Sequence, residues 1–257
     1  MKRIISGLLL TFFGIVLIAG CTKNKDPYAA YRQKSPAEIF QKAQKSFNKK
    51  HYADAIKSYD ALNTIYPFSR YSQQARFNSI TAYYKDGNND GAMTAADEYI
   101  RLYPQDRHVD YAYYMKGLTS FRGGLNWLQK KANVSDSERD PEHLQIAYNI
   151  FSIIVQDFPH SKYRDKAREH MREIRDLLAE HEIRIGNFYF RKKAYMASIN
   201  RANIVLKNFR DTPSVADALV LRIKAYRKLK MPNVANDSLL RLKKQYPNSR
   251  QYKSMIS

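Results

Sequence analysis

The chain has 257 residues, with 44 lysines and arginines against 24 aspartates and glutamates, which gives a formal charge of +20. It contains a single cysteine, so an intramolecular disulfide is excluded and the fold has to be held together by packing. A chain of this length can bury a substantial core. The large positive charge favours anionic partners such as nucleic acid, lipid phosphates or acidic proteins.

The N-terminus has the features of an export signal. A basic start, Met1-Lys2-Arg3, precedes an apolar stretch from Ile4 to Ala19 that is too short and too weakly flanked for a transmembrane helix. This stretch leads into Cys21 through Leu17-Ile18-Ala19-Gly20, a string that resembles a bacterial lipobox. Residues 1–20 are therefore predicted to be a lipoprotein signal peptide, and the Cys21 thiolate is predicted to be the lipidated nucleophile. An aspartate after the cysteine would retain the protein in the inner membrane, but the residue here is Thr22. We therefore expect the protein to be located on the periplasmic face of the outer membrane. Nucleic acid is not expected as a partner in this location.

The mature chain is predicted to start with a flexible segment and to continue as a helical domain. Residues 21–34 are polar and are expected to form a lipidated tether, and the domain is expected to occupy residues 35–257. Ser35 can cap the first helix, Pro36 suits its first position, and Glu38 completes a capping box. Apolar residues recur at steps of three and four, which predicts an all-α fold.

A repeated pattern runs along this domain. A small residue is followed twelve positions later by proline, as from Ala55 to Pro67, and further copies start at Ala92, Ala147, Ser198 (degenerate) and Ala235. An aromatic residue stands just before each end point. The pattern resembles the second helix of a tetratricopeptide repeat, in which the small residue lets two helices approach and the proline ends the helix. Five copies predict a right-handed solenoid of about five helix pairs.

The spacing of the copies predicts two irregular elements. The copies are offset by 37, 55, 51 and 37 residues. The offset of 55 predicts an insertion over residues 117–140, between N-terminal repeats at 35–116 and C-terminal repeats at 141–257. The offset of 51 predicts a long helix from about Tyr163 to Lys192, whose apolar stripe reaches Phe188 and buries one face.

The sequence does not favour an enzyme. The six histidines are scattered, and the chain has neither a His-Glu-x-x-His pair nor a phosphate-binding Gly-x-x-x-x-Gly-Lys loop. A helical cell-wall lytic enzyme would need a separate catalytic domain, for which no chain is left over. We therefore expect a protein-binding scaffold without catalytic residues, metal or cofactor.

Several strings are more specific than a generic repeat consensus. They include Tyr66-Pro67-Phe68, Ala82-Tyr83-Tyr84-Lys85, Tyr99-Ile100-Arg101-Leu102 and Arg139-Asp140-Pro141. With these strings the chain resembles the BamD family of lipoproteins from the lipobox to near the C-terminus.

The resemblance implies five repeats and a non-enzymatic role in the machinery that inserts β-barrel proteins into the outer membrane. It implies as partners the POTRA domains of the barrel protein BamA, other Bam lipoproteins, and the C-terminal signal strands of unfolded barrel proteins. An alternative function is a periplasmic repeat lipoprotein that scaffolds peptidoglycan synthesis, which would share the lipobox and the repeats but not the strings above.

Two groups of residues are candidates for binding. Tyr66, Phe68 and Arg70 lie at a turn in the N-terminal half, where an aromatic cleft beside a guanidinium would hold the terminal ring and carboxylate of a signal strand. The alternative is that Tyr66 only packs the turn. Asn200-Arg201 matches an Asn-Arg pair that the family places at the contact with BamA, and a guanidinium can hold a carboxylate through two parallel bonds. The alternative there is a solvated surface charge.

Overall fold

The computed structural model describes residues 26–123 and 141–256, and all regular secondary structure in these ranges is helical. The predicted all-α fold is thus confirmed. The first range contains a short 3-10 helix, η2 (Ala29–Tyr31), followed by α2 (Pro36–Asn48), α3 (Tyr52–Ile65), α4 (Ser72–Asp86), α5 (Asn89–Leu102) and α6 (Val109–Gly123). The second contains α8 (Pro141–Asp157), α9 (Arg164–Arg191), α10 (Tyr195–Asn208), α11 (Ser214–Lys228), α12 (Pro232–Gln245) and α13 (Arg250–Ile256).

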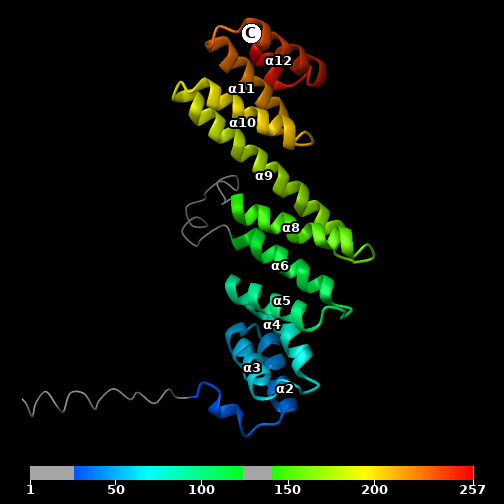
Figure 1. Ribbon diagram of the computed structural model, residues 1–257. Helices are drawn as coiled ribbons and strands as arrows, with labels where there is room; N and C mark the ends of the chain where they lie inside the picture. Colours follow the sequence, from blue (N-terminus) through cyan, green and yellow to red (C-terminus); the bar gives the residue numbers. More distant parts are fainter. Residues whose placement is uncertain (1–25, 124–140, 257) are drawn as a thin grey trace, which may run out of the picture.

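The helices form an elongated stack, as Figure 1 shows. Each helix packs on the next along the chain, which gives the pairs α2/α3, α4/α5, α6/α8, α9/α10 and α11/α12. The last helix, α13, lies against α11 and α12 at the end of the stack. The arrangement confirms a helical-repeat solenoid with the five pairs that the periodicity predicts.

The core of each pair uses the residues that define the repeat. The small residues near the start of the second helices are all buried, namely Ala55, Ala92, Ala147, Ser198 and Ala235. The aromatic residues before the repeat ends cap these helices, and their N–H groups donate to the carbonyl four residues earlier, as at Tyr66, Tyr103, Phe158, Phe209 and Tyr246. Because each pair packs mainly on its neighbours, the stack gains stability one interface at a time.

The turn inside a pair has one recurring backbone geometry. Lys50, Lys193 and Lys230 have φ angles of 62°, 61° and 58°, and Gly87 has a φ of 80° at the equivalent position. The N–H groups of this residue and of the next donate to carbonyls in the last turn of the preceding helix. This is a left-handed helix C-cap, where glycine is the usual residue. Three lysines therefore adopt a conformation that L-residues rarely take.

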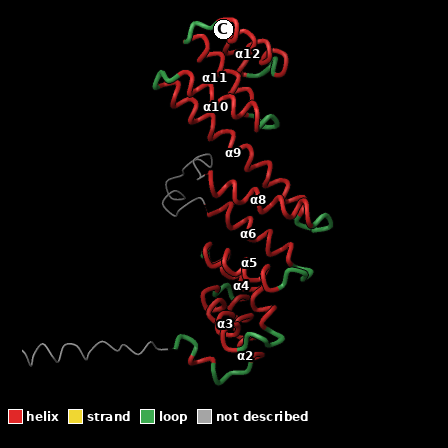
Figure 2. Tube along the Cα trace, in the orientation of Figure 1, coloured by secondary structure: helices red, strands yellow, loops and turns green. Residues whose placement is uncertain are grey.

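Turns inside pairs and turns between pairs lie at different edges of the stack. In Figure 2 the α9–α10 and α11–α12 turns, which lie inside pairs, are on the left. The α5–α6 and α8–α9 turns, which connect successive pairs, are on the right. The two edges can therefore contact different partners.

The packed structure begins before residue 35, the predicted boundary of the domain. Ser35 caps α2 and forms the predicted capping box with Glu38. Upstream of it, Tyr31 is buried, and its hydroxyl oxygen lies 3.1 Å from the Oγ atom of Ser58. The described part of the expected tether, residues 26–34, is thus attached to the first repeat through the side chains of Tyr28 and Tyr31. The predicted signal peptide and Cys21 lie outside the described residues.

The insertion starts later than the sequence predicts. Helix α6 continues to Gly123, so residues 117–123 belong to a repeat helix. A β-carbon at Gly117 would lie 2.6 Å from a ring carbon of Phe151 on α8, so this glycine permits close packing of two helices. Residues 124–140 lie outside the described ranges, and α8 starts at Pro141 as expected.

The 28-residue helix α9 confirms the predicted long helix. Its N-terminal half contributes Ala167 and Ile174 to the hydrophobic cluster of the third pair, and Ala179 belongs to the cluster of the C-terminal pairs. The predicted apolar stripe is wrong at its end, because Phe188 is exposed. The last turns of α9 are packed through other residues, since Gly186 is buried against Leu221 and Phe190 lies against the C-terminal cluster.

Candidate functional site

Tyr66 is engaged in packing at the turn between the first two pairs. It caps α3, is half-buried, and packs against the hydrophobic cluster of the first pair. Its hydroxyl donates to the backbone oxygen of Lys34 at 2.9 Å, and its own backbone oxygen accepts a hydrogen bond from the Ser72 hydroxyl. Tyr66 therefore ties the segment before α2 and the start of α4 to the same turn.

Phe68 and Arg70 are presented outward from this turn. Phe68 is 99% exposed, so its ring extends into solvent and does not line a closed cleft. The Arg70 guanidinium lies 4.8 Å from the centre of the Tyr71 ring and donates to the Tyr71 hydroxyl at 2.6 Å. The structure thus brings together a free aromatic ring and a cation on one turn. Tyr66 anchors this turn to the hydrophobic cluster of the first pair.

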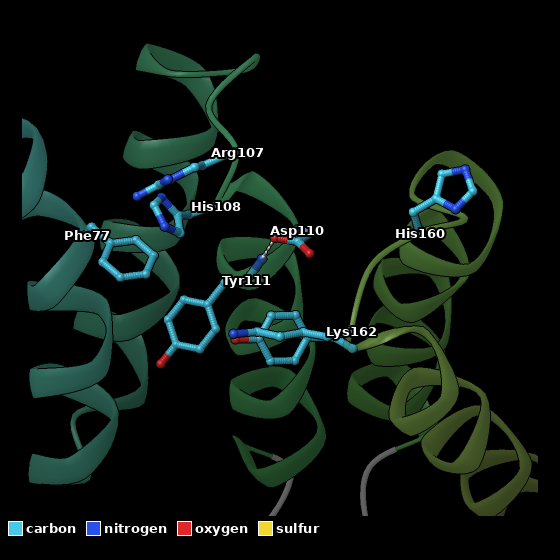
Figure 3. A pocket seen from close by; sticks show the side chains of 8 residues that line it. Phe77, Arg107, His108, Asp110, Tyr111, His160 and Lys162 are labelled. Atoms are coloured by element: carbon cyan, nitrogen blue, oxygen red, sulfur yellow. Dashed lines mark hydrogen bonds between the residues drawn. The ribbon is translucent and has the colours of Figure 1, made fainter.

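A groove that the sequence did not reveal lies further along the edge formed by the turns between pairs. It has a volume of about 690 Å³ and is lined by side chains from α4, α6 and the α5–α6 and α8–α9 turns (Figure 3), namely Phe77, Arg107, His108, Asp110, Tyr111, His160, Lys162 and Tyr163. A smaller hollow of about 350 Å³ adjoins it and shares Arg107, Asp110 and His160. The two hollows therefore lie side by side on this edge.

Aromatic rings line one side of the groove. The ring centre of Tyr111 lies 5.1 Å from that of Phe77 and 5.4 Å from that of Tyr163. The hydroxyl oxygen of Tyr111 lies 2.7 Å from that of Thr81, and burial raises the pKa of this phenol above its ordinary value. These rings offer a rigid apolar surface to a ligand side chain.

The charged groups of the groove are the cations Arg107 and Lys162 and the carboxylate of Asp110, and the adjoining hollow adds the carboxylates of Asp106 and Asp157. Arg107 and Lys162 are exposed, and within the described part of the chain neither forms an ion pair. Asp110 accepts a hydrogen bond from the Ser161 hydroxyl at 2.6 Å. Burial raises the pKa of Asp106, but hydrogen bonds from the backbone of His108 and from the Tyr99 hydroxyl outweigh it and keep the pKa below its ordinary value. The groove can thus accept an anionic group beside an apolar or aromatic one.

The repeat pattern contains the signal that would have located this groove. The turn Tyr66-Pro67-Phe68-Ser69-Arg70-Tyr71 has three counterparts. Two of them line the groove and the adjoining hollow, Tyr103-Pro104-Gln105-Asp106-Arg107-His108 and Phe158-Pro159-His160-Ser161-Lys162-Tyr163. The third, Tyr246-Pro247-Asn248-Ser249-Arg250-Gln251, follows the last pair. In each turn the fourth residue donates its N–H to the carbonyl of the first, at 3.0 to 3.1 Å. The cations Arg70, Arg107, Lys162 and Arg250 are therefore equivalent by repeat position. Sequence reasoning singled out Arg70 and missed the two equivalents that line the groove.

Arg201 lies in an ion pair inside the chain. Its Nη1 atom lies 3.1 Å from a carboxylate oxygen of Glu182, which joins α10 to α9. The Glu182 side chain is only 18% exposed and that of Arg201 35% exposed. Neighbouring Asn200 is exposed. Arg201 is therefore a positioned guanidinium with part of its surface open, and it is not a freely solvated charge.

Comparison with known proteins decides the family. A sequence profile described as "YfiO: Outer membrane lipoprotein" matches residues 32–242. The chain belongs to this family. It is similar to the outer membrane protein assembly factor BamD of Neisseria meningitidis, with 35% identity over 251 residues that cover 97% of this chain and 93% of the relative. The BamD proteins of Vibrio cholerae (30% identity, 88% and 90% covered) and Haemophilus influenzae (32%, 93% and 89%) are also similar.

Family and fold together define the class of protein. The chain is an outer membrane protein assembly factor built as a non-enzymatic helical-repeat scaffold, which separates it from the peptidoglycan alternative. Within the described ranges no group of three His, Cys, Asp or Glu side chains is placed to hold a metal ion. No helix in these ranges is long and apolar enough to cross a membrane.

Proposed function

We propose that this protein is a lipid-anchored subunit of the outer-membrane β-barrel assembly machinery. Its C-terminal repeats bind the POTRA domains of a BamA protein, its N-terminal repeats bind the C-terminal signal strands of unfolded barrel proteins, and other Bam lipoproteins join the same scaffold. Anchoring through Cys21 places it on the periplasmic face of the outer membrane. The observation that carries the proposal is the series of aromatic and cationic turns on one edge of a BamD-type repeat stack.

The signal strand is proposed to bind along this edge, starting at Tyr66, Phe68 and Arg70. A terminal aromatic ring would pack on Phe68 or on the rings of the groove, and the chain-end carboxylate would pair with Arg70, Arg107 or Lys162. Support comes from the exposure of Phe68 and from the three cations, which have no carboxylate partner within the described residues.

Peptide binding by turn variants tests this site. A peptide that ends in phenylalanine with a free carboxylate should bind at least tenfold more tightly than its amidated form, because a charged pair is lost on amidation. The double variant Phe68→Ala/Arg70→Ala, or the double variant Arg107→Ala/Lys162→Ala, should remove the preference for the free carboxylate over the amide. Arg250→Ala is the matched control, since Arg250 holds the same turn position after the last pair. Equal binding of the two peptides to the wild type, or an equal loss in the control, rules out this edge.

The partner contact is proposed to use Asn200 and Arg201. The Glu182 carboxylate holds the guanidinium in place, and the open part of the guanidinium would receive an acidic side chain of a POTRA domain. Preorganisation of this kind lowers the entropy cost of binding.

A pair of variants separates binding from stability. Arg201→Ala removes the guanidinium and leaves Glu182 without its partner, so it should weaken POTRA binding at least tenfold and also lower the thermal stability. Glu182→Gln breaks the same ion pair but keeps the guanidinium, so it should lower stability while retaining most of the affinity. Calorimetric titration against a POTRA fragment decides between the outcomes. Equal affinity losses in the two variants would mean that Arg201 acts only within the fold.

A further inference from the structure

We propose that the turns inside the last two pairs form a surface that docks on anionic phospholipid headgroups. This surface, here called the basic edge, consists of Lys192, Lys193, Arg227, Lys228 and Lys230. It lies at the left of the stack in Figure 2, on the side opposite the turns that line the groove. The inference is independent of the proposed signal-strand and POTRA contacts.

The charge of the chain is concentrated in the C-terminal helices that carry this edge. Residues 183–257 contain 17 lysines and arginines, three aspartates and no glutamate. These residues thus carry +14 of the formal charge of +20. No acidic residue occurs between Glu182 and Asp211, or between Asp217 and Asp237, the two stretches that contain the turns. A concentration of positive charge of this kind attracts an extended anionic surface.

The cations of the basic edge are free to bind. All five are exposed, and within the described residues none has a carboxylate partner. Lys192 lies over the Phe188 ring, with Nζ 5.9 Å from the ring centre, and this contact leaves its charge available. Helices α9 and α11, which end in these turns, pack against each other, so the two groups of cations belong to one rigid part of the fold.

Two of the lysines are placed at a cost in backbone energy. Lys193 and Lys230 have φ angles of 61° and 58°, at the position where the second pair has Gly87. Glycine would satisfy the same turn without the steric penalty of an L-residue. Both lysines are exposed and have no carboxylate partner within the described residues, so their charges are available to a ligand outside the fold.

Exposed apolar side chains flank both turns. Phe188 is 47% exposed and Met196 56% exposed beside the first turn, and Met231 is 43% exposed in the second. Cations that surround a few apolar groups are typical of protein surfaces that lie in the headgroup region of a bilayer. A polyanion without an apolar region, such as an acidic polypeptide or a nucleic acid, would leave these side chains in water. The combination therefore favours a lipid surface over the other anionic partners.

Vesicle sedimentation tests the proposal. The probe protein is the chain from residue 21 onward with Cys21→Ser, which includes every described helix but cannot be acylated. It should bind vesicles of phosphatidylcholine with phosphatidylglycerol and not vesicles of phosphatidylcholine alone. Each lysine near an anionic surface contributes about fivefold in affinity, so Lys192→Gln/Lys193→Gln/Lys230→Gln should weaken binding roughly 100-fold. Phe188→Ser/Met196→Ser/Met231→Ser should weaken it about tenfold at unchanged charge.

The first intra-pair turn provides a matched control. Lys45→Gln/Lys49→Gln/Lys50→Gln removes the same charge and also one lysine of positive φ, but no exposed large apolar residue flanks that turn. The fold-loss in vesicle affinity of this variant should be less than a fifth of the fold-loss of Lys192→Gln/Lys193→Gln/Lys230→Gln. Its helical circular dichroism should match that of the other variants. An equal loss in both triple variants would show that net charge alone drives binding and would overturn the proposal. Full competition by polyglutamate, with the apolar variant binding like the wild type, would overturn it in favour of an acidic polypeptide.

Discussion

Single residues at the turns determine how the stack is built. The lysines at positive φ are the clearest case, because an L-residue in the left-handed region costs about 1–2 kcal/mol relative to the right-handed one. Lys50 has this conformation, whereas the preceding Lys49 has φ −81° and ψ 2°, which any residue adopts. The two neighbours have the same side chain and the same exposure class, and they differ in backbone geometry.

The pair predicts opposite effects of one substitution. Lys50→Gly should raise the free energy of unfolding by roughly 0.5–1 kcal/mol, because the released strain exceeds the extra chain entropy of glycine. Lys49→Gly should lower it by a similar amount, since it adds chain entropy and relieves no strain. Urea unfolding of the two variants measures both effects, and a loss of stability in Lys50→Gly would show that the turn is not strained.

At the level of elements, helix crossings depend on close contacts that a repeat pattern does not specify. Gly117 on α6 faces the buried ring of Phe151 on α8, and that ring stacks on His170 of α9, with 5.1 Å between ring centres and an angle of 22°. Three helices therefore meet at one aromatic ring, with the glycine on one side of it.

Gly117→Ala should destabilise the protein by about 1–3 kcal/mol, because the new methyl group overpacks this contact. Helix propensity alone predicts the opposite, a gain of about 1 kcal/mol. A double-mutant cycle with Phe151→Leu checks the cause, since the smaller side chain should recover part of the loss. Additive effects in the cycle would place the destabilisation elsewhere.

A second link between elements depends on pH. Arg175 on α9 donates to both carboxylate oxygens of Asp211 and to the backbone oxygen of Asn208, which fixes the end of α10. The hydrogen bond from Arg175 is the main reason why the pKa of Asp211 is below its ordinary value.

Because this pKa is lower in the folded state, the pair stabilises the protein above the unfolded pKa of about 4, and the contribution is lost as the pH falls through the folded value. Asp211→Asn should therefore cost roughly 0–1 kcal/mol at neutral pH, a small effect because the carboxylate is 59% exposed. The difference in unfolding free energy between variant and wild type should shrink toward zero in strong acid. A difference that is constant with pH would mean that the lost interaction does not depend on the charge of Asp211.

The difference between contacts within a helix and contacts between helices explains which features the sequence predicts. Periodicity within one helix and between repeats predicted the five pairs, the long α9 and the capping box at Ser35, because these features depend on residues close in the chain. It failed at Gly117 and Phe188, where burial depends on which neighbouring helix lies opposite. The ion pair of Arg201 with Glu182 escaped it for the same reason, since it joins residues that meet only through helix packing. The cations of the groove around Tyr111 could have been found from the repeat position that they share with Arg70, but the packing of its rings could not.

The whole molecule has an uneven charge and, as we propose, two separate means of membrane association. The first is the acyl group on Cys21, and the second is the basic edge at the other end of the stack. Acyl chains contribute about 0.8 kcal/mol for each buried methylene and are insensitive to salt, whereas headgroup contacts of lysine are screened by salt.

A salt wash of membranes from cells should distinguish attachment by the acyl group from attachment by the basic edge. Wild-type protein should stay with the membrane fraction in a wash with concentrated salt, and the mass of its N-terminal peptide should show an acylated Cys21. The Cys21→Ser protein should remain folded, associate partly with membranes at low salt, and be released by the same wash. Salt-resistant association of the Cys21→Ser protein would contradict the lipid anchor as the main attachment.

The length of α9 has a mechanical consequence. A helix of 28 residues is about 42 Å long. It contains no proline, and its one glycine, Gly186, is packed against Leu221, so no residue within it is a natural hinge. The groove adjoins the first turn of this rod, and Glu182, the partner of Arg201, lies near its far end. α9 therefore fixes the distance between the groove and Arg201. A ligand in the groove and a partner at Arg201 would be held at a constant separation, and a displacement of one would move the other.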